Sequence, residues 1–150
     1  MKSLRKALPN INDAVARGKR ARALENRHFL LVEEPPDRRK RSLELLEKAG
    51  AEVMLERHAL TGVAVALSMP ERFDALILDV KRKPLEIIEA SIALRAAGFD
   101  RPIIALIPGL YEKGQRSLQH AGCHIIQKNS EIASAFVGLV AGFIRSKPAA

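Results

Sequence analysis

The sequence predicts an α/β protein, a three-layer αβα sandwich built on a five-stranded parallel sheet. Three observations indicate this fold class. Short apolar runs alternate with longer amphipathic segments, the units repeat every roughly 20 to 28 residues as βα crossovers do, and the runs are too apolar to have a solvated face. Because right-handed crossovers place helices on both faces of such a sheet, we expect the flavodoxin-like strand order 2-1-3-4-5.

Each element has its own signal in the chain. The apolar runs predict strands at 29–32, 51–55, 74–80, 102–107 and 123–126. The segments between them predict helices at 37–49, 61–67, 85–97 and 111–121, and a last helix from residue 129 or 130. Glycine takes the left-handed conformation that ends helices at little cost, so Gly50, Gly98 and Gly122 are the expected stops. The last helix carries an apolar stripe of Ile132, Phe136, Leu139, Val140 and Phe143.

The chain has 150 residues, enough for one domain with a proper core. Its formal charge of +8 is uneven, because residues 1–27 hold eight Lys or Arg against Asp13 and Glu25, a balance of +6. We therefore divide the chain into a basic N-terminal arm or linker at 1–27, a domain at 28–145 and a tail at 146–150. A short helix is expected from Asn10. The arm lacks aromatic residues that could stack on bases. This favours a solvated linker, or an arm packed on a neighbour, over a segment that binds nucleic acid.

Several classes of protein are disfavoured by composition. The single cysteine, Cys123, excludes an internal disulfide and a multi-thiolate metal site, and is expected to be a small core residue. No apolar run approaches the roughly 20 residues of a membrane span, so we expect a cytoplasmic protein without a membrane partner. The four histidines, which show no ligand spacing, are expected to be structural or surface residues; they are His28, His58, His120 and His124.

Charged residues gather where strands are predicted to end. Glu33 and Glu34 follow the first strand, Asp79 ends the third, and Lys128 lies just past the fifth. We expect the 2-1-3-4-5 order to place strands 1, 3 and 5 side by side, so that these groups share one rim of the sheet. Carboxylates this close need a positive partner, which Lys128 or Mg²⁺, a hard cation bound by oxygen ligands, would provide. Glu33 and Glu34 could equally cap the next helix.

These residues resemble those of the response-regulator receiver domain of two-component signalling. The resemblance covers residues 28 to about 145 and rests on 31–35, 74–80, 102–107 and 127–128. It implies that Asp79 attacks the phosphorus of a phosphohistidine and that Lys128 pairs with the resulting phosphoryl group. It further implies a Mg²⁺ site in which Glu34, Asp79 and the backbone carbonyl of Lys81 bind the ion and Glu33 supports it through water.

The sequence departs from that family where the phosphoryl group would be sensed. Ile107 stands where the family has a Ser or Thr hydroxyl, and Ile125 where it tends to have a Tyr or Phe that swings inward. The acidic pair is Glu-Glu where Asp is usual, and the turn after Asp79 is short and basic. The parts that would perform transfer are present in altered form, and the parts that would report it are missing. Any response must run through the loop at 81–84 or the one at 108–109.

Two main hypotheses of function follow. The first is a phosphorelay receiver that accepts a phosphoryl group on Asp79 from a histidine kinase or a histidine phosphotransfer protein; its only catalysis would be Mg²⁺-dependent self-phosphorylation. The second is a pseudo-receiver, a protein-interaction module that works without phosphorylation. Homodimerisation remains open. An independent small-molecule enzyme is disfavoured, because no glycine-rich phosphate loop or nucleophile–base pair is present.

Overall fold

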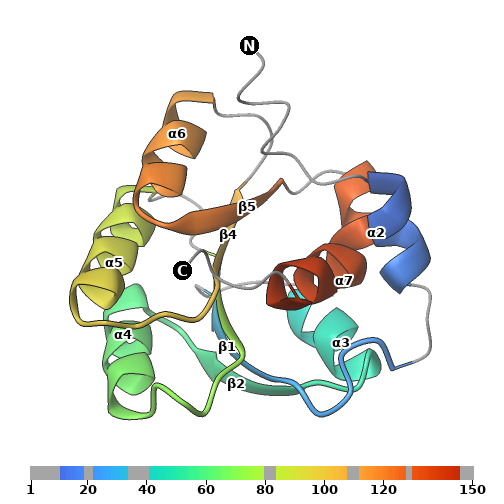
Figure 1. The fold of residues 1–150 in the computed structure, drawn as a ribbon, viewed down its shortest axis with the longest axis horizontal. Helices are drawn as coiled ribbons and strands as arrows, with labels where there is room; N and C mark the ends of the chain where they lie inside the picture. The colour runs from blue at the N-terminus through green and yellow to red at the C-terminus, as the bar shows by residue number, and fades with distance from the viewer. Residues whose placement is uncertain are drawn as a thin grey trace.

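The chain folds around one parallel sheet with helices on both sides (Figure 1). The structure, a computed structural model, describes residues 11–18, 22–33, 41–79, 84–107, 112–127 and 130–145. All five predicted strands are present, shifted by no more than two residues at either end. They are β1 (His28–Glu33), β2 (Glu52–Glu56), β3 (Ala75–Asp79), β4 (Ile103–Ile107) and β5 (Cys123–Gln127).

The predicted helices are present as well, except that residues 37–40 and 111, where two of them were expected to begin, lie outside the described ranges. Those that follow the strands are α3 (Arg41–Lys48), α4 (Ala59–Ser68), α5 (Pro84–Ala96), α6 (Glu112–His120) and α7 (Ser130–Arg145). The short N-terminal helix is α2 (Ile11–Gly18). Gly50, Gly98 and Gly122 all have positive φ after α3, α5 and α6, which confirms their expected role as stops. Within the described residues, no helix is both long enough and apolar enough to cross a bilayer.

The strand order is β2-β1-β3-β4-β5 with every neighbouring pair parallel, which confirms the predicted fold. Successive side chains on a strand point to opposite faces, so the sheet separates two apolar cores. Leu30, Leu76 and Ile103 belong to the core under α4, α5 and α6. Phe29 and Ile77 belong to the core on the other side, with α2, α3 and α7. Figure 1 shows these two helical layers flanking the sheet.

One expectation about the rim was wrong. Strands 1, 3 and 5 do not lie side by side, because β4 pairs with both β3 and β5 and separates them. Neighbouring strands are about 4.8 Å apart, so β3 and β5 are about 10 Å apart. Any group just beyond β5 must therefore reach across β4 to meet Asp79.

The segment before β1 contacts the body of the protein, so it is packed, one of the two alternatives that the sequence left open. Ala14 of α2 and Leu24, in the turn before β1, are fully or almost fully buried. Helix α2 packs on α7, and Arg17 Nη1 donates a hydrogen bond of 2.9 Å to the backbone carbonyl of Gly138. Domain limits at residues 27 and 145 remain a prediction, but α2 is in contact with the fold.

Candidate functional site

The candidate site is built on two carboxylates at the carboxyl edge of the sheet. Glu33 is the last residue of β1, Asp79 is the last residue of β3, and the two are register partners in the parallel pair. Both are buried in the chain, with exposed fractions of 6% for Glu33 and 1% for Asp79. Burying a carboxylate costs free energy unless it has polar or charged partners. Two buried carboxylates on adjacent strands therefore indicate a site with a specific role.

Strand alternation puts both side chains on the same face of the sheet. Phe29 and Leu31 of β1 and Ala75 and Ile77 of β3 all belong to the core beneath α3 and α7. Residues two positions further along a strand keep the same side, so Glu33 and Asp79 follow these residues on that face. The two carboxylates are therefore neighbours in register and in direction.

Three further predicted site residues lie outside the part of the chain that the structure describes. Glu34 follows β1 directly, Lys81 lies in the segment between Asp79 and α5, and Lys128 follows Gln127, the end of β5. Their roles as metal ligand, carbonyl ligand and phosphoryl partner stay predictions. The sheet fixes only that Lys128 leaves a strand two places away from β3.

Ile107 and Ile125, the altered switch positions, are buried in the opposite core. Both belong to the cluster beneath α4, α5 and α6, together with Leu118 of α6. Because Ala105 pairs with Ile125, and Ile107 lies two residues beyond Ala105, the two isoleucines are diagonal neighbours on one face. Each fills core space with apolar atoms and offers no hydrogen-bond donor.

The donor set fits a hard cation in part. Carboxylate oxygens suit Mg²⁺, which is usually held by one or two carboxylates with water and phosphate. Glu33 and Asp79 provide two such groups at adjacent positions. No group of three or more His, Cys, Asp or Glu that could hold a metal occurs in the described ranges. Within these ranges, Glu33 and Asp79 are the residues that would hold the ion.

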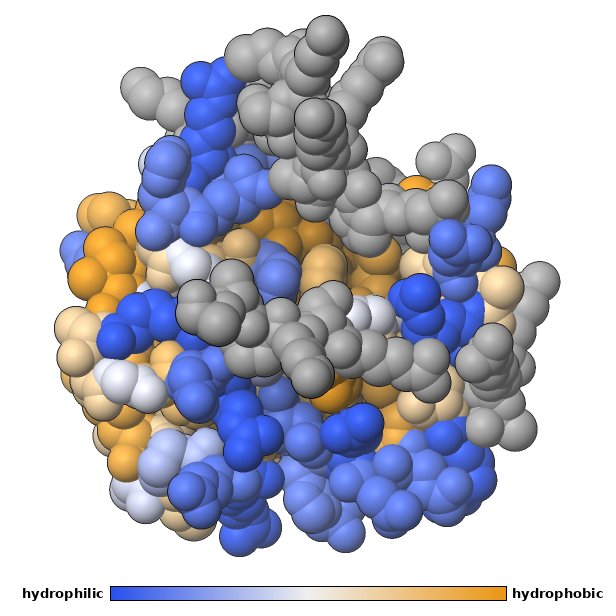
Figure 2. Space-filling model, in the orientation of Figure 1, coloured by the Kyte–Doolittle hydropathy of each residue, from blue (hydrophilic) through white to orange (hydrophobic). Residues whose placement is uncertain are grey.

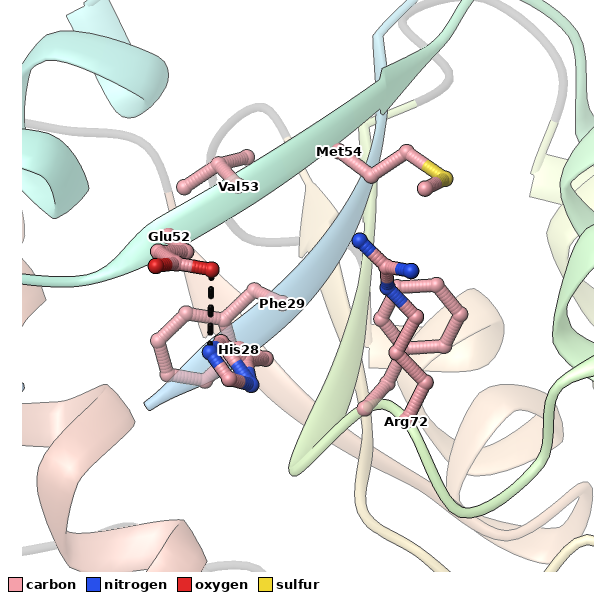
Figure 3. Close-up of a pocket in the computed structure, with 7 residues that line it drawn as sticks. His28, Phe29, Glu52, Val53, Met54 and Arg72 are labelled. Atoms are coloured by element: carbon pink, nitrogen blue, oxygen red, sulfur yellow. Dashed lines mark ion pairs between the residues drawn. The ribbon is translucent and has the colours of Figure 1, made fainter. Parts of the chain in front are cut away.

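The opposite, amino-terminal edge of the sheet has polar groups that the sequence did not single out. Asp74 precedes β3 and accepts a 2.8 Å hydrogen bond from the backbone N–H of His28, tying the starts of β1 and β3 together. His28 Nε2 lies 3.0 Å from Glu52 Oε2 at the rim of a pocket of about 220 Å³. Figure 3 shows this ion pair on one side of the pocket and Arg72 on the other. An aspartate just before a strand is a common pattern, so the sequence alone does not reveal that Asp74 links the starts of two strands.

A second polar cluster joins α5 to the start of β5. Arg95 donates hydrogen bonds of 2.8 to 2.9 Å to three backbone carbonyls, those of Phe99, Arg101 and Gly122. Burial raises the pKa of the Cys123 thiol, whose sulfur lies 2.9 Å from the Ser91 hydroxyl oxygen. A raised thiol pKa means little thiolate at neutral pH, so Cys123 fits the expected core residue and not a nucleophile. The cluster is structural.

No protein-family model and no curated protein matches the sequence. The structure is similar to the receiver domain of a sensor histidine kinase from Pseudomonas aeruginosa, solved with a magnesium ion coordinated in its active-site cleft. That match has a TM-score of 0.65 and 24% identity, and covers 80% of this chain and 98% of the other.

Two further solved structures define how far the similarity extends. The receiver domain of a Francisella response regulator matches with a TM-score of 0.62 and 14% identity over 77% of this chain and 96% of its own. A cobalamin-binding protein from Desulfitobacterium hafniense matches with a TM-score of 0.55 and 14% identity over 93% of this chain and 75% of its own. Proteins with different ligands share this architecture, so the architecture alone does not select a chemistry.

The matches to receiver domains agree with the observed fold. At these sequence identities the comparison shows the fold alone. The chain has the fold of receiver domains, with a sequence that is 24% and 14% identical to the two receiver domains compared.

Proposed function

We propose that this protein is a phosphorelay receiver that accepts a phosphoryl group on Asp79 from a phosphohistidine of a partner kinase or phosphotransfer protein. The observation that supports this most is the pairing of Asp79 with Glu33. Two buried carboxylates stand in register at the carboxyl edge of a parallel sheet, on one face. In such folds that edge is where ligands bind.

The transfer is an in-line substitution at phosphorus. An Oδ oxygen of Asp79 forms a bond to phosphorus while the P–N bond of the phosphohistidine breaks, and the bonding electron pair stays on the imidazole nitrogen. Bound Mg²⁺ would neutralise charge on the phosphoryl oxygens. Glu33 would hold that ion from the neighbouring strand, and Lys128 would reach across β4 to pair with the product.

Intact-mass measurement with a small phosphodonor and Mg²⁺ tests this proposal. We expect one added phosphoryl group on the wild-type chain and none on Asp79→Asn. The matched control is Asp100→Asn, an equal change at an exposed aspartate before β4, which should be phosphorylated like the wild type. Glu33→Gln should slow the reaction by about 10- to 100-fold, as loss of a metal-site partner typically does. An unchanged mass with several donors, or equal phosphorylation of Asp79→Asn, would reject the proposal.

A second candidate, an interaction module that does not depend on phosphorylation, is favoured by Ile107 and Ile125. Their burial in the core leaves these two positions without a hydroxyl or a mobile aromatic ring to report the phosphoryl group. Titration with Mg²⁺ followed by amide NMR separates the candidates. Shifts centred on Glu33 and Asp79 at millimolar Mg²⁺ support the receiver, and a spectrum that does not respond supports the interaction module.

A further inference from the structure

The outward side of α4 and α5 is apolar and has no cover among the described residues. Four of the five large hydrophobic side chains that are exposed in the described chain lie on these two helices. The exposed fractions are 82% for Leu60, 63% for Leu85 and 54% for Ile92. Figure 2 shows apolar residues along the left edge of the view, where Figure 1 places α5 and α4. Contiguous exposed apolar surface typically marks an interaction site.

The spacing of these residues gives each helix a continuous outward stripe. On α4 the exposed residues Leu60, Ala64 and Leu67 recur at helical spacing, while Gly62 and Ala66 are buried against the sheet. On α5 the outward stripe is Leu85, Glu89, Ile92 and Ala96. The two helices pack against each other, and their inner residues share one core, so the stripes border a common surface.

The charge on this surface is opposite to that of the protein. Helix α4 has no charged residue, and Glu89 is the only charged residue in the α5 stripe. Glu89 makes no hydrogen bond or ion pair with any described residue. Arg95 of α5 directs its guanidinium to the carbonyls of Phe99, Arg101 and Gly122. The chain as a whole has a net charge of +8, but this surface has a single carboxylate among apolar side chains. It therefore favours a partner that places a positively charged group beside Glu89.

We propose that the α4–α5 surface binds an amphipathic helix of a partner protein, with an apolar stripe against Leu60, Leu85 and Ile92 and a lysine or arginine beside Glu89. Two packed helices form a ridge-and-groove surface on which a third helix can lay its apolar side. A second copy of this chain fits less well. A symmetric contact would turn the same stripe on itself and bring the Glu89 carboxylates together away from water.

Two labelled synthetic helical peptides test this with the full chain. Both carry the same leucine stripe, and they differ only in having lysine or glutamate next to it. Fluorescence anisotropy should show the lysine peptide binding at least about tenfold more tightly, since one favourable charge contact replaces one repulsive contact. Ile92→Ser should weaken that binding, and its exposed position means that the variant should fold; a thermal melt checks this.

The charge-reversal variant Glu89→Lys makes the test specific. It should reverse the order of the two peptides. The control Glu47→Lys, the same change at an exposed residue of α3 on the other side of the sheet, should leave the order unchanged. Equal binding of both peptides, or an order that Glu89→Lys does not alter, overturns the proposal. So does a dimer seen by light scattering that Ile92→Ser dissociates, because the occupant is then a second copy.

Discussion

The two helical layers of this protein differ in what covers their outer surfaces. On one side of the sheet, α7 carries a further helix, α2, on its outer surface. On the other side, α4 and α5 present Leu60, Leu85 and Ile92 outward with no described residue covering them. Both layers carry more apolar surface than is needed to cover the sheet. Among the described residues, only the α7 layer has a further helix packed on that surface.

The difference lies in the residues on the outer surfaces. Gly138 of α7 lets the backbone of α2 approach closely, and Ala14 of α2 is fully buried in that contact. On α4 and α5 the outward residues are mainly large or charged, as a surface that receives side chains would be. The first arrangement is a permanent helix–helix contact, and the second has the character of a docking surface.

The largest effect is expected for Gly138→Ala. A Cβ atom at this position would collide with the backbone carbonyl oxygen of Ala14, which cannot move unless α2 shifts. We expect a loss of about 2 to 3 kcal/mol in the free energy of unfolding, as for other overpacked sites. Denaturant unfolding measures it. Gly142→Ala is the control, because its Cβ would meet only the end of the Arg17 side chain, which can move. Equal losses in both variants would contradict a backbone contact.

The fold was predictable because its signals are local and repeated. Apolar runs of strand length, the glycine stops at Gly50, Gly98 and Gly122, and the unit length all point to one architecture. The α2–α7 contact was not predictable in the same way, because Gly138 in a helix pattern usually indicates only weak helix propensity. An available signal was that α7 is apolar on more than one side, with Val137, Ala141 and Ile144 outside the predicted stripe.

The candidate site was predictable in part. Strand ends fixed Glu33 and Asp79, and the sheet register brings them together. The expectation that strands 1, 3 and 5 are neighbours was wrong although the strand order was predicted correctly, because this order itself places β4 between β3 and β5. Contacts such as those of Arg95 with three carbonyls depend on loop geometry, which no residue pattern in the sequence specifies.

A smaller effect is expected from pH on the side that α7 covers. His124 of β5 stacks on Phe143 of α7, with ring centroids 4.4 Å apart. Burial, and secondarily the charge of Arg95, lowers the pKa of His124 below its ordinary value of about 6.5. Below pH 6.5 the unfolded chain takes up a proton that the folded chain does not, so this contribution to stability falls as pH drops toward the folded-state pKa.

Replacing His124 with phenylalanine should remove this dependence and keep an aromatic ring against Phe143. Thermal unfolding of both proteins between pH 7.5 and pH 5 measures it, and the wild type should lose more stability on acidification than His124→Phe. His58→Phe, at an exposed histidine before α4, is the control and should behave as the wild type does. If the His124→Phe and wild-type curves run parallel, His124 does not titrate differently in the folded state.

The smallest effect is expected on the uncovered side, where Ile92→Lys should change the free energy of unfolding by no more than about 0.5 kcal/mol. More than half of the Ile92 side chain is exposed, so the substitution loses little buried area and places the ammonium in water. Denaturant unfolding of the full chain measures this. A loss above about 1 kcal/mol would mean that Ile92 is covered by another part of the chain, which would make the two sides of the sheet alike. A neutral result, combined with loss of binding by the lysine peptide, would separate a surface kept for a partner from one kept for folding.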